Sequence, residues 1–208
     1  MAIEIELKAH VVEVEAIKRL LFEKAAFLWT FDKEDSYWVQ EARAGGEPGH
    51  YLGSAENTGP RFRLRREKLT FPDGSEKTSC LLTYKTKQVR DGIEINDEKE
   101  FEVSSRSGRT EQVFKEFLLS AGLKPDISKR KRGWAFSREE TNAELCEVET
   151  LGWFIELEII LDDADSGEDS YAESRSRLLG FLDSLGIEKK AIESRFYSEM
   201  LKESGISS

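Results

Sequence analysis

The stretch Glu4-Ile5-Glu6-Leu7-Lys8 does most to decide the fold expected for this chain of 208 residues. Charged and apolar residues alternate along it, and a period of two is typical of a β-strand with one apolar and one ionic face. The alternation returns in acidic form around Phe101 and Leu157, and in basic form around Phe62 and Leu64. The sequence therefore predicts several strands that each carry one ionic face.

These ionic faces need partners, because like charges two residues apart on one strand lie roughly 7 Å from each other and repel. A solvated sheet face explains any single pair, since exposed cross-strand ion pairs contribute only about 0 to 1 kcal/mol each. It does not explain why the intervening residues form a consistent apolar face, which must pack under helices. Those residues are Ile3, Ile5, Leu7, Phe62, Leu64, Phe101, Val103, Ile155, Leu157 and Ile159.

With helices outside, roughly eight such strands can turn their ionic faces inward and close a narrow antiparallel barrel. We therefore predict an α+β fold with a closed, eight-stranded antiparallel β-barrel that forms a tunnel. The interior of a barrel of this size is only just wide enough for side chains. A tunnel lined by both signs of charge is costly unless it is filled. A divalent cation would satisfy several carboxylates and a polyphosphate would satisfy Lys and Arg, so the two ligands together would neutralise the lining.

Helical spacing and turn chemistry give the order of the other elements. The predicted helices cover residues 12–29 and 109–121, the region from Leu178 to Leu185, and 190–201. The later predicted strands cover residues 33–40, 61–67, 79–87, 97–103, 127–137, 143–149 and 153–161. Phe71-Pro72-Asp73-Gly74 predicts a hairpin turn, and residues 44–60 predict a long loop.

Composition narrows the class of protein. The hydrophobic content of 38% suits one domain, which we expect over residues 1–202, with a flexible tail at 203–208. The formal net charge of -10 argues against nucleic-acid binding, although a local basic groove could bind phosphates. The chain shows no long apolar run and no leader pattern, so we expect a cytoplasmic monomer or homodimer with no membrane partner. Cys80 and Cys146 are too few for a disulfide framework.

Several motifs follow one another along nearly the whole chain. They are the E-x-E-x-K of Glu4, Glu6 and Lys8, the R-x-R of Arg63 and Arg65, Leu82-Thr83-Tyr84-Lys85, Leu151-Gly152-Trp153-Phe154-Ile155-Glu156-Leu157-Glu158, and Phe196-Tyr197-Ser198-Glu199-Met200-Leu201. In this order they resemble the CYTH family, the triphosphate tunnel metalloenzymes that include class IV adenylate cyclases and thiamine triphosphatases. The resemblance implies a triphosphate substrate and Mg²⁺ or Mn²⁺ as the cofactor.

The resemblance also implies which side chains hold the metal and carry the reaction. The metal would be bound by Glu4, Glu6 and Glu158, with Glu156 beside them. The catalytic group would consist of Glu4, Glu6, Glu158 and Lys8.

A second implied set binds the triphosphate. It consists of Lys8, Arg63, Arg65 and Lys85. Glu98 and Glu100 match an acidic strand of the family, where they would orient the basic side chains or hold a second metal through water.

Two positions depart from the family pattern. The family places a Lys and an Arg two residues apart on one strand, and here either Lys129 and Lys131 or Arg130 and Arg132 take those places. The first frame replaces the planar fork of Arg by the point charge of Lys. Cys146 stands where many relatives have an Asp, and a neutral thiol is a poor ligand for Mg²⁺.

The lost Asp leaves two readings of the metal site open. Glu144 lies two residues before Cys146 on the same face and could replace the missing carboxylate. Alternatively, this site binds one metal where others bind two.

The reaction depends on the nucleophile. The two histidines, His10 and His50, do not suggest a Ser-His or Cys-His site. The first hypothesis is a class IV adenylate cyclase, which converts ATP into cyclic AMP and pyrophosphate. The alternatives are a hydrolase of tripolyphosphate or thiamine triphosphate, a non-catalytic triphosphate sensor, and a structural adaptor with a solvated charged face. Tyr37, Trp38 and residues 44–60 are candidates for recognising adenine or thiamine.

Overall fold

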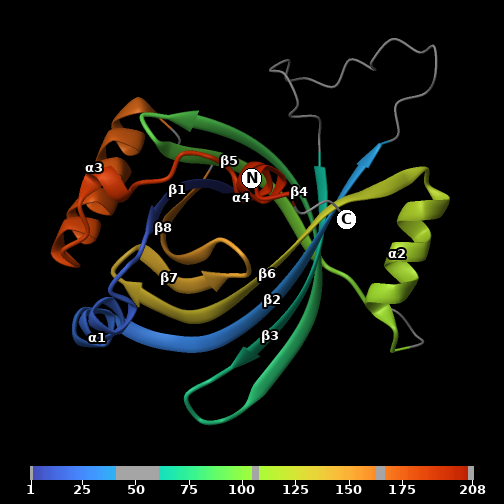
Figure 1. Ribbon diagram of the computed structural model, residues 1–208, viewed down its shortest axis with the longest axis horizontal. Helices are drawn as coiled ribbons and strands as arrows, with labels where there is room; N and C mark the ends of the chain where they lie inside the picture. Colours follow the sequence, from blue (N-terminus) through green and yellow to red (C-terminus); the bar gives the residue numbers. More distant parts are fainter. Residues whose placement is uncertain (1, 41–60, 105–107, 163–166, 206–208) are drawn as a thin grey trace.

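The computed structural model describes residues 2–40, 61–104, 108–162 and 167–205, and its centre is a closed barrel (Figure 1). The strands follow the order β1-β5-β4-β3-β2-β6-β7-β8 around the barrel, and each neighbouring pair is antiparallel. The predicted fold class is confirmed. The strands are β1 (Ala2–His10), β2 (Ala26–Gln40), β3 (Arg61–Thr70), β4 (Glu76–Arg90), β5 (Ile93–Glu102), β6 (Leu123–Arg138), β7 (Thr141–Val148) and β8 (Gly152–Asp162). The helices are α1 (Val14–Lys24), α2 (Thr110–Ser120), α3 (Glu168–Ser184), the 3-10 turn η2 (Lys189–Ala191) and α4 (Tyr197–Glu203).

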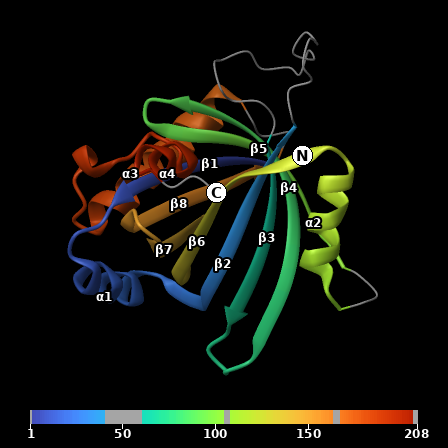
Figure 2. The same cartoon turned by 45° about the vertical axis from the view of Figure 1, so that its right-hand side comes forward.

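The apolar faces of β1, β7 and β8 point outward and pack under α1 and α3. Leu7 and Leu157 are fully buried there, against Leu178 and Leu182 of α3 and Leu21 of α1. Figure 2 shows both helices on the side of the barrel away from α2. Because successive side chains of a strand point to opposite faces, the charged residues between these apolar positions must face the lumen.

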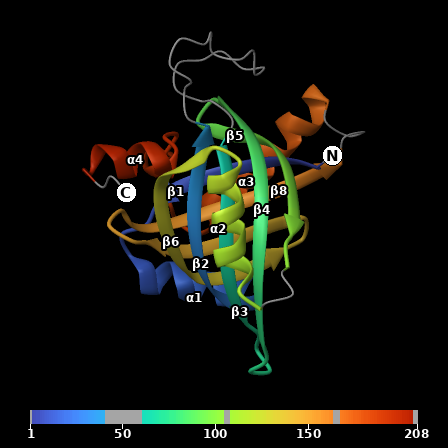
Figure 3. The same cartoon turned by 90° about the vertical axis from the view of Figure 1, so that its right-hand side faces the viewer.

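The opposite side of the barrel is covered by α2, which lies across β2, β3 and β4 in Figure 3. Leu118 of α2 packs with Trp38, Leu64 and Leu82 on the outer face of these strands. Trp38 is only 3% exposed, and its Nε1 donates a hydrogen bond to Ser36 Oγ at 3.0 Å. The suggestion that Trp38 recognises a base is therefore wrong, because its ring belongs to the outer core.

A third cluster fills part of the lumen itself. We call it the inner apolar cluster, and it brings together residues of β2, β3, β6, β7, β8 and α4. Its buried members are Phe31, Leu69, Ala135, Cys146, Val148, Phe154, Tyr197 and Met200. The lumen is therefore not ionic along its whole length, because these side chains, two of them from α4, occupy part of it.

Two predicted helices differ from those observed. The helix expected over residues 12–29 ends at Lys24, and residues 26–29 belong to β2, since Ala26 and Phe27 pair with β6. The last expected helix, 190–201, is divided into η2 and α4. Ile192 and Phe196 are extended, with ψ of 130° and 147°, and a bridge from Ala9 to Ile192 ties this segment to β1.

Other predictions concern the connections. The turn at residues 71–74 joins β3 to β4, and Gly74 has a φ of 82°, which glycine adopts without strain. Residues 44–60, the expected loop, lie outside the described residues, as do 206–208 of the expected tail, while Glu203 is still part of α4. Within the described ranges, no helix combines the length and apolar character needed to cross a membrane.

Gly133 of β6 allows a close approach of β6 to β7. A Cβ built on it would lie 2.0 Å from the Leu145 carbonyl oxygen and 2.8 Å from Cys146 Cα, both of which are backbone atoms of β7. Gly133→Ala should therefore lower the free energy of unfolding in urea by about 3 kcal/mol. Gly180→Ala in the middle of α3, where a Cβ meets nothing within 4 Å, should raise it by about 1 kcal/mol. Equal effects would contradict the packing described.

Candidate functional site: the charged lumen

The register of β6 decides which basic residues face the lumen. Lys129 pairs with Asp35 and Lys131 with Lys33, and both side chains are at most 6% exposed. Arg130 and Arg132 point outward, where their side chains are 40% and 54% exposed. Of the two frames left open by the sequence, the structure therefore selects Lys129 and Lys131.

The acidic wall of the lumen is built by β1, β5 and β8. Glu6 lies opposite Glu94 on one side and opposite Glu158 on the other, and Glu4 follows two residues away on the same face. Lys8 is 1% exposed and donates a hydrogen bond to Glu94 Oε1 at 2.7 Å. Burial alone would lower the pKa of Lys8, but the nearby carboxylates of Glu94 and Glu6 outweigh it and raise the pKa. Lys8 is therefore a fixed cation within this wall.

Asp35 of β2 organises the basic wall. Its carboxylate accepts two hydrogen bonds from Arg65, from Nε at 2.6 Å and Nη2 at 2.9 Å, and it lies 3.2 Å from Lys129 Nζ. Burial would raise the pKa of Asp35, but Arg65 and Lys129 hold it well below its usual value. Asp35 is therefore ionised, and it fixes one cation from β3 and one from β6.

A chain of buried ion pairs runs along one wall of the lumen, over the neighbouring strands β2, β6, β7 and β8, and ends at α4. Lys33 Nζ lies 2.5 Å from Glu144 Oε1, and Lys131 Nζ lies 2.7 Å from Glu144 Oε2 and 2.5 Å from Glu156 Oε2. Tyr197 of α4 donates a hydrogen bond to Glu156 Oε1 at 2.7 Å. Although burial favours the neutral acids, Lys131 is the main partner that lowers the pKa of both Glu144 and Glu156. The chain therefore alternates in charge.

Arg63 lies among the acidic residues of β5. Its Nη2 is 3.0 Å from Glu100 and 3.7 Å from Glu98, and it also donates to Thr83 Oγ1 at 3.0 Å. Glu98 and Glu100 are thus placed where they can orient a basic side chain. Lys85 lies opposite Glu98 in the register of β4 and β5, but its side chain is outside the described part of the structure.

Cys146 faces the lumen from β7 and is completely buried. Its Sγ lies 3.8 Å from Glu156 Oε1, and Cys146 belongs to the inner apolar cluster. Burial is the main cause that raises the pKa of this thiol well above its ordinary value, and the Glu156 charge adds to it. Cys146 is therefore a neutral packing residue, and Glu156 beside it is held by Lys131 and Tyr197.

The predicted metal ligands lie in the lumen, and their chemistry can be compared with what Mg²⁺ or Mn²⁺ requires. Within the described ranges, no three His, Cys, Asp or Glu side chains converge as a ready-made metal cluster. The donor chemistry nevertheless fits, because Glu6 and Glu158 are direct cross-strand neighbours and Glu4 shares their face. Carboxylate oxygens are the ligands that Mg²⁺ and Mn²⁺ prefer. Glu156 fits less well, since both of its oxygens have partners.

Several lumen residues were not predicted from the sequence. Phe31, Lys33 and Asp35 share one face of β2, but residues 32–35 are charged on both faces, so no alternation of charged and apolar residues showed which face turns inward. Glu94 and Asn96 continue the alternation of β5 toward its beginning. The side chains of both residues are buried. Tyr197 could not be found from periodicity, because it reaches Glu156 from a short helix 41 residues away.

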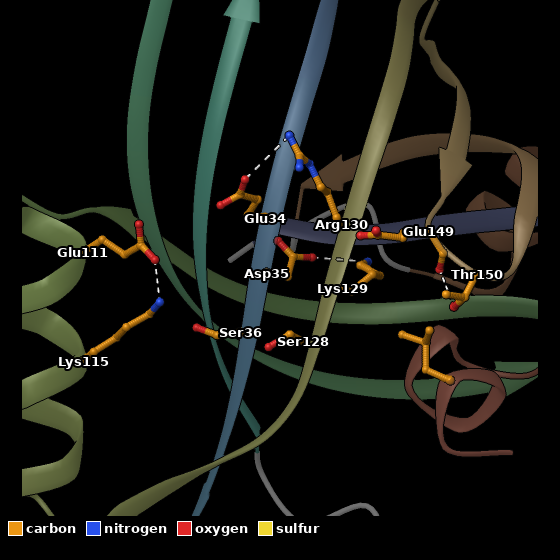
Figure 4. A pocket seen from close by; sticks show the side chains of 11 residues that line it. Glu34, Asp35, Ser36, Glu111, Lys115, Ser128, Lys129, Arg130, Glu149 and Thr150 are labelled. Carbon is orange, nitrogen blue, oxygen red and sulfur yellow. Dashed lines mark hydrogen bonds and ion pairs between the residues drawn. The ribbon is translucent and has the colours of Figure 1, made fainter. Parts of the chain in front are cut away.

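A hollow of about 520 Å³ lies between α2, the pair β2 and β6, α4 and the turn after β7, and it reaches the buried pair of Asp35 and Lys129 (Figure 4). Its cations have acidic neighbours close by. Lys115 lies 2.5 Å from Glu111, and Arg130 lies 3.8 Å from Glu34 and also pairs with Asp32. These are solvent-exposed pairs on single elements or neighbouring strands. The lumen differs from this hollow because it gathers buried cations from strands on opposite walls.

Comparisons with known proteins agree with this architecture. No protein-family model matches the chain, and no curated protein matches it in sequence. The PH1819 protein from Pyrococcus horikoshii is 25% identical, with a TM-score of 0.75 over 97% of this chain and 99% of that one. A candidate adenylate cyclase from Vibrio parahaemolyticus is 17% identical, with a TM-score of 0.68 over 96% and 97% of the two chains.

A third solved structure is a candidate adenylyl cyclase from Hippeastrum whose dominant activity is that of a triphosphatase. It is 16% identical, with a TM-score of 0.62 over 99% of this chain and 96% of that one. Sequence identities this low show a shared fold only. The chain therefore shares the fold of these structures, a closed barrel of the triphosphate tunnel type.

Asp35 and Asp32 offer a matched test of the lumen. Both accept two hydrogen bonds from one Arg, but Asp35 is completely buried, whereas Asp32 pairs with Arg130 on the outer face and is 34% exposed. Asp35→Asn should lower the free energy of unfolding at pH 7 by about 3 to 5 kcal/mol, because it leaves buried cations uncompensated. Asp32→Asn should lower it by about 0 to 1 kcal/mol.

The effect of Asp35→Asn should also depend on pH. Because the folded pKa of Asp35 lies below its unfolded value, its stabilisation is complete above pH of about 4 and is lost as the pH falls through the folded pKa. The difference between wild type and Asp35→Asn in urea unfolding should therefore narrow only in strong acid. Equal losses for Asp35→Asn and Asp32→Asn at pH 7 would contradict the account of the lumen.

Proposed function

We propose that the lumen binds a triphosphate and that the chain is a divalent-metal-dependent enzyme that acts on it. The observation that carries the proposal is the convergence of buried cations from four strands. Lys8 of β1 and Lys129 of β6 approach one ring from different walls, at 4.9 and 4.8 Å from its centroid. Arg65 of β3 and Lys33 of β2 complete the set. A chain of three phosphates could contact several of these strands at once.

The charge balance supports a metal cofactor. Among the described lumen side chains, carboxylates outnumber cations. The cations are Lys8, Lys33, Arg63, Arg65, Lys129 and Lys131, and the carboxylates are Glu4, Glu6, Asp35, Glu67, Glu94, Glu98, Glu100, Glu144, Glu156 and Glu158. A triphosphate alone would be repelled by the carboxylates of this set that lie on β1 and β8. Mg²⁺ or Mn²⁺ would be held by Glu4, Glu6 and Glu158 and, when bound, would neutralise charge on the phosphate oxygens.

The remaining chemistry belongs to the basic wall. Arg63 and Arg65 can bind phosphate oxygens through their planar forks, and Lys8 and Lys129 supply point charges. Because Asp35 and Glu94 already hold Arg65, Lys129 and Lys8 in place, little reorganisation is needed during the reaction. Preorganised charge of this kind provides much of the rate in phosphoryl transfer, which needs no histidine base.

The nucleophile separates the two candidate reactions. The first is cyclisation of ATP to cyclic AMP and pyrophosphate, as in class IV adenylate cyclases. The second is attack of water on a terminal phosphorus of tripolyphosphate or thiamine triphosphate. Hydrolysis is supported by the Hippeastrum protein, a candidate cyclase of the same fold that acts mainly as a triphosphatase. A third candidate, a sensor without turnover, is supported by the neutral Cys146.

The test is product analysis with ATP, tripolyphosphate and thiamine triphosphate in the presence of Mg²⁺ or Mn²⁺. We expect turnover by the wild type, its loss on removal of the divalent cation, and a fall of at least about a hundredfold in Glu6→Gln, since a carboxylate of the metal site is lost. Glu147→Gln is the control, because Glu147 lies on the outer face, 3.6 Å from Arg132. It should retain wild-type activity.

The products then identify the reaction. Cyclic AMP with pyrophosphate would establish a cyclase, and inorganic phosphate would establish a hydrolase. Binding without turnover would favour the sensor. Metal-independent turnover, or full activity in Glu6→Gln, would contradict the proposed enzyme.

A further inference from the structure

Tyr197 is the point at which the C-terminal helix α4 meets the charged lumen. It is the first residue of α4, its side chain is 9% exposed, and its ring lies in the inner apolar cluster. Phe154 of β8 packs against it edge to face, with the ring centroids 5.1 Å apart. The same ring carries a hydroxyl that points into the ionic part of the lumen, so Tyr197 has an apolar and a polar environment at once.

The ring of Tyr197 contacts two of the cations proposed to bind phosphate. Lys8 Nζ of β1 lies 4.9 Å from its centroid, and Lys129 Nζ of β6 lies 4.8 Å from it. Both distances are within the range of a cation–π interaction. One aromatic ring therefore lies within reach of two ammonium groups from different strands.

The hydroxyl of Tyr197 binds a carboxylate that also interacts with those cations. It donates a hydrogen bond to Glu156 Oε1 at 2.7 Å, while Lys131 binds Oε2 at 2.5 Å. Glu156 also interacts electrostatically with Lys8 and Lys129. Without the hydroxyl, Lys131 would still hold Oε2, but Oε1 would lose its donor and could turn toward these two ammonium groups.

We propose that Tyr197 is a positioning residue of the lumen, one that keeps Lys8 and Lys129 available to the phosphates of the substrate by supporting them with its ring and by retaining Glu156 with its hydroxyl. This inference deepens the proposed function and rests on it. It also gives Glu156 a role different from that of a metal ligand, because its two oxygens serve Tyr197 and Lys131. The C-terminal helix thereby becomes part of the binding site.

A second tyrosine supplies a matched control. Tyr171 of α3 is 8% exposed, its hydroxyl donates to the Arg90 carbonyl oxygen at 3.1 Å, and the Arg90 guanidinium lies 4.7 Å from its ring centroid. It has the same burial, a hydroxyl bond and a cation on its ring, but it lies outside the lumen. Tyr171→Phe therefore removes a comparable hydroxyl without touching the proposed site.

The experiment measures the dissociation constant of tripolyphosphate by calorimetry with Mn²⁺ present, and KM and kcat wherever turnover is found. Tyr197→Phe should raise the dissociation constant and KM about tenfold, with a smaller change in kcat, because one charge-assisted hydrogen bond is lost. Tyr197→Leu, which also removes the ring, should weaken binding by a further factor of about five. Tyr171→Phe should bind within about twofold of the wild type.

The outcomes separate this inference from the proposed function. A wild type that neither binds tripolyphosphate nor turns over any triphosphate contradicts the proposed function and the role of Tyr197 with it. A wild type that binds, with Tyr197→Phe binding equally well, overturns the positioning role alone. Weakening in Tyr197→Phe and Tyr171→Phe to the same extent would also overturn it, since general destabilisation would then explain both. Weakening confined to the Tyr197 variants supports it.

Discussion

The burial of opposite charges inside one closed barrel is the constraint on which the rest of the structure depends. Each buried ion costs several kcal/mol unless it is paired and hydrogen-bonded. The pairs of Arg65 with Asp35, Lys8 with Glu94 and Lys131 with Glu144 join different strands, so they compensate only when all strands keep their register. A slip of one residue would turn every charge of a strand into the apolar layer under the helices. The ionic lumen thereby specifies the barrel.

The same pairing prepares the lumen for a ligand. In this structure the cations are held by carboxylates, and a phosphate oxygen can replace a carboxylate oxygen at a cation without leaving it unpaired. The released carboxylates would then need a new partner, which a divalent cation provides. Substrate and metal would therefore be expected to bind together. This coupling belongs to the proposed function and does not depend on the nucleophile that completes the reaction.

Strand alternation made much of the fold predictable. The run from Glu4 to Lys8 was sufficient to assign the inward and outward faces of β1, and the turn at residues 71–74 placed a hairpin correctly. Residues 26–29 were predicted to be helical but belong to β2. Only Ala25 separates α1 from β2, and both elements are rich in apolar residues at this point. Only pairing with β6 decides that boundary, and pairing is not visible in a single sequence.

The site was predicted less completely than the fold. Charged residues inside recognised motifs were found, whereas Asp35 and Glu94 were not, because their importance comes from the cations they face on neighbouring strands. The sequence could not decide between Lys129 and Arg130 for the same reason, since a run of basic residues can face the lumen in either frame. Predicting the role of Tyr197 would have required knowledge of where a short C-terminal helix packs. In each case the missing information was a contact between distant residues.

The most direct test of the lumen as the binding site compares two neighbours on β6, Lys129 inside the barrel and Arg130 outside it. The measurement is the dissociation constant of tripolyphosphate with Mn²⁺ for Lys129→Gln and Arg130→Gln, each a loss of one positive charge. The account predicts weakening of about tenfold or more for Lys129→Gln and a change within about twofold for Arg130→Gln. Equal effects, or a larger effect of Arg130→Gln, would show that triphosphate binds elsewhere.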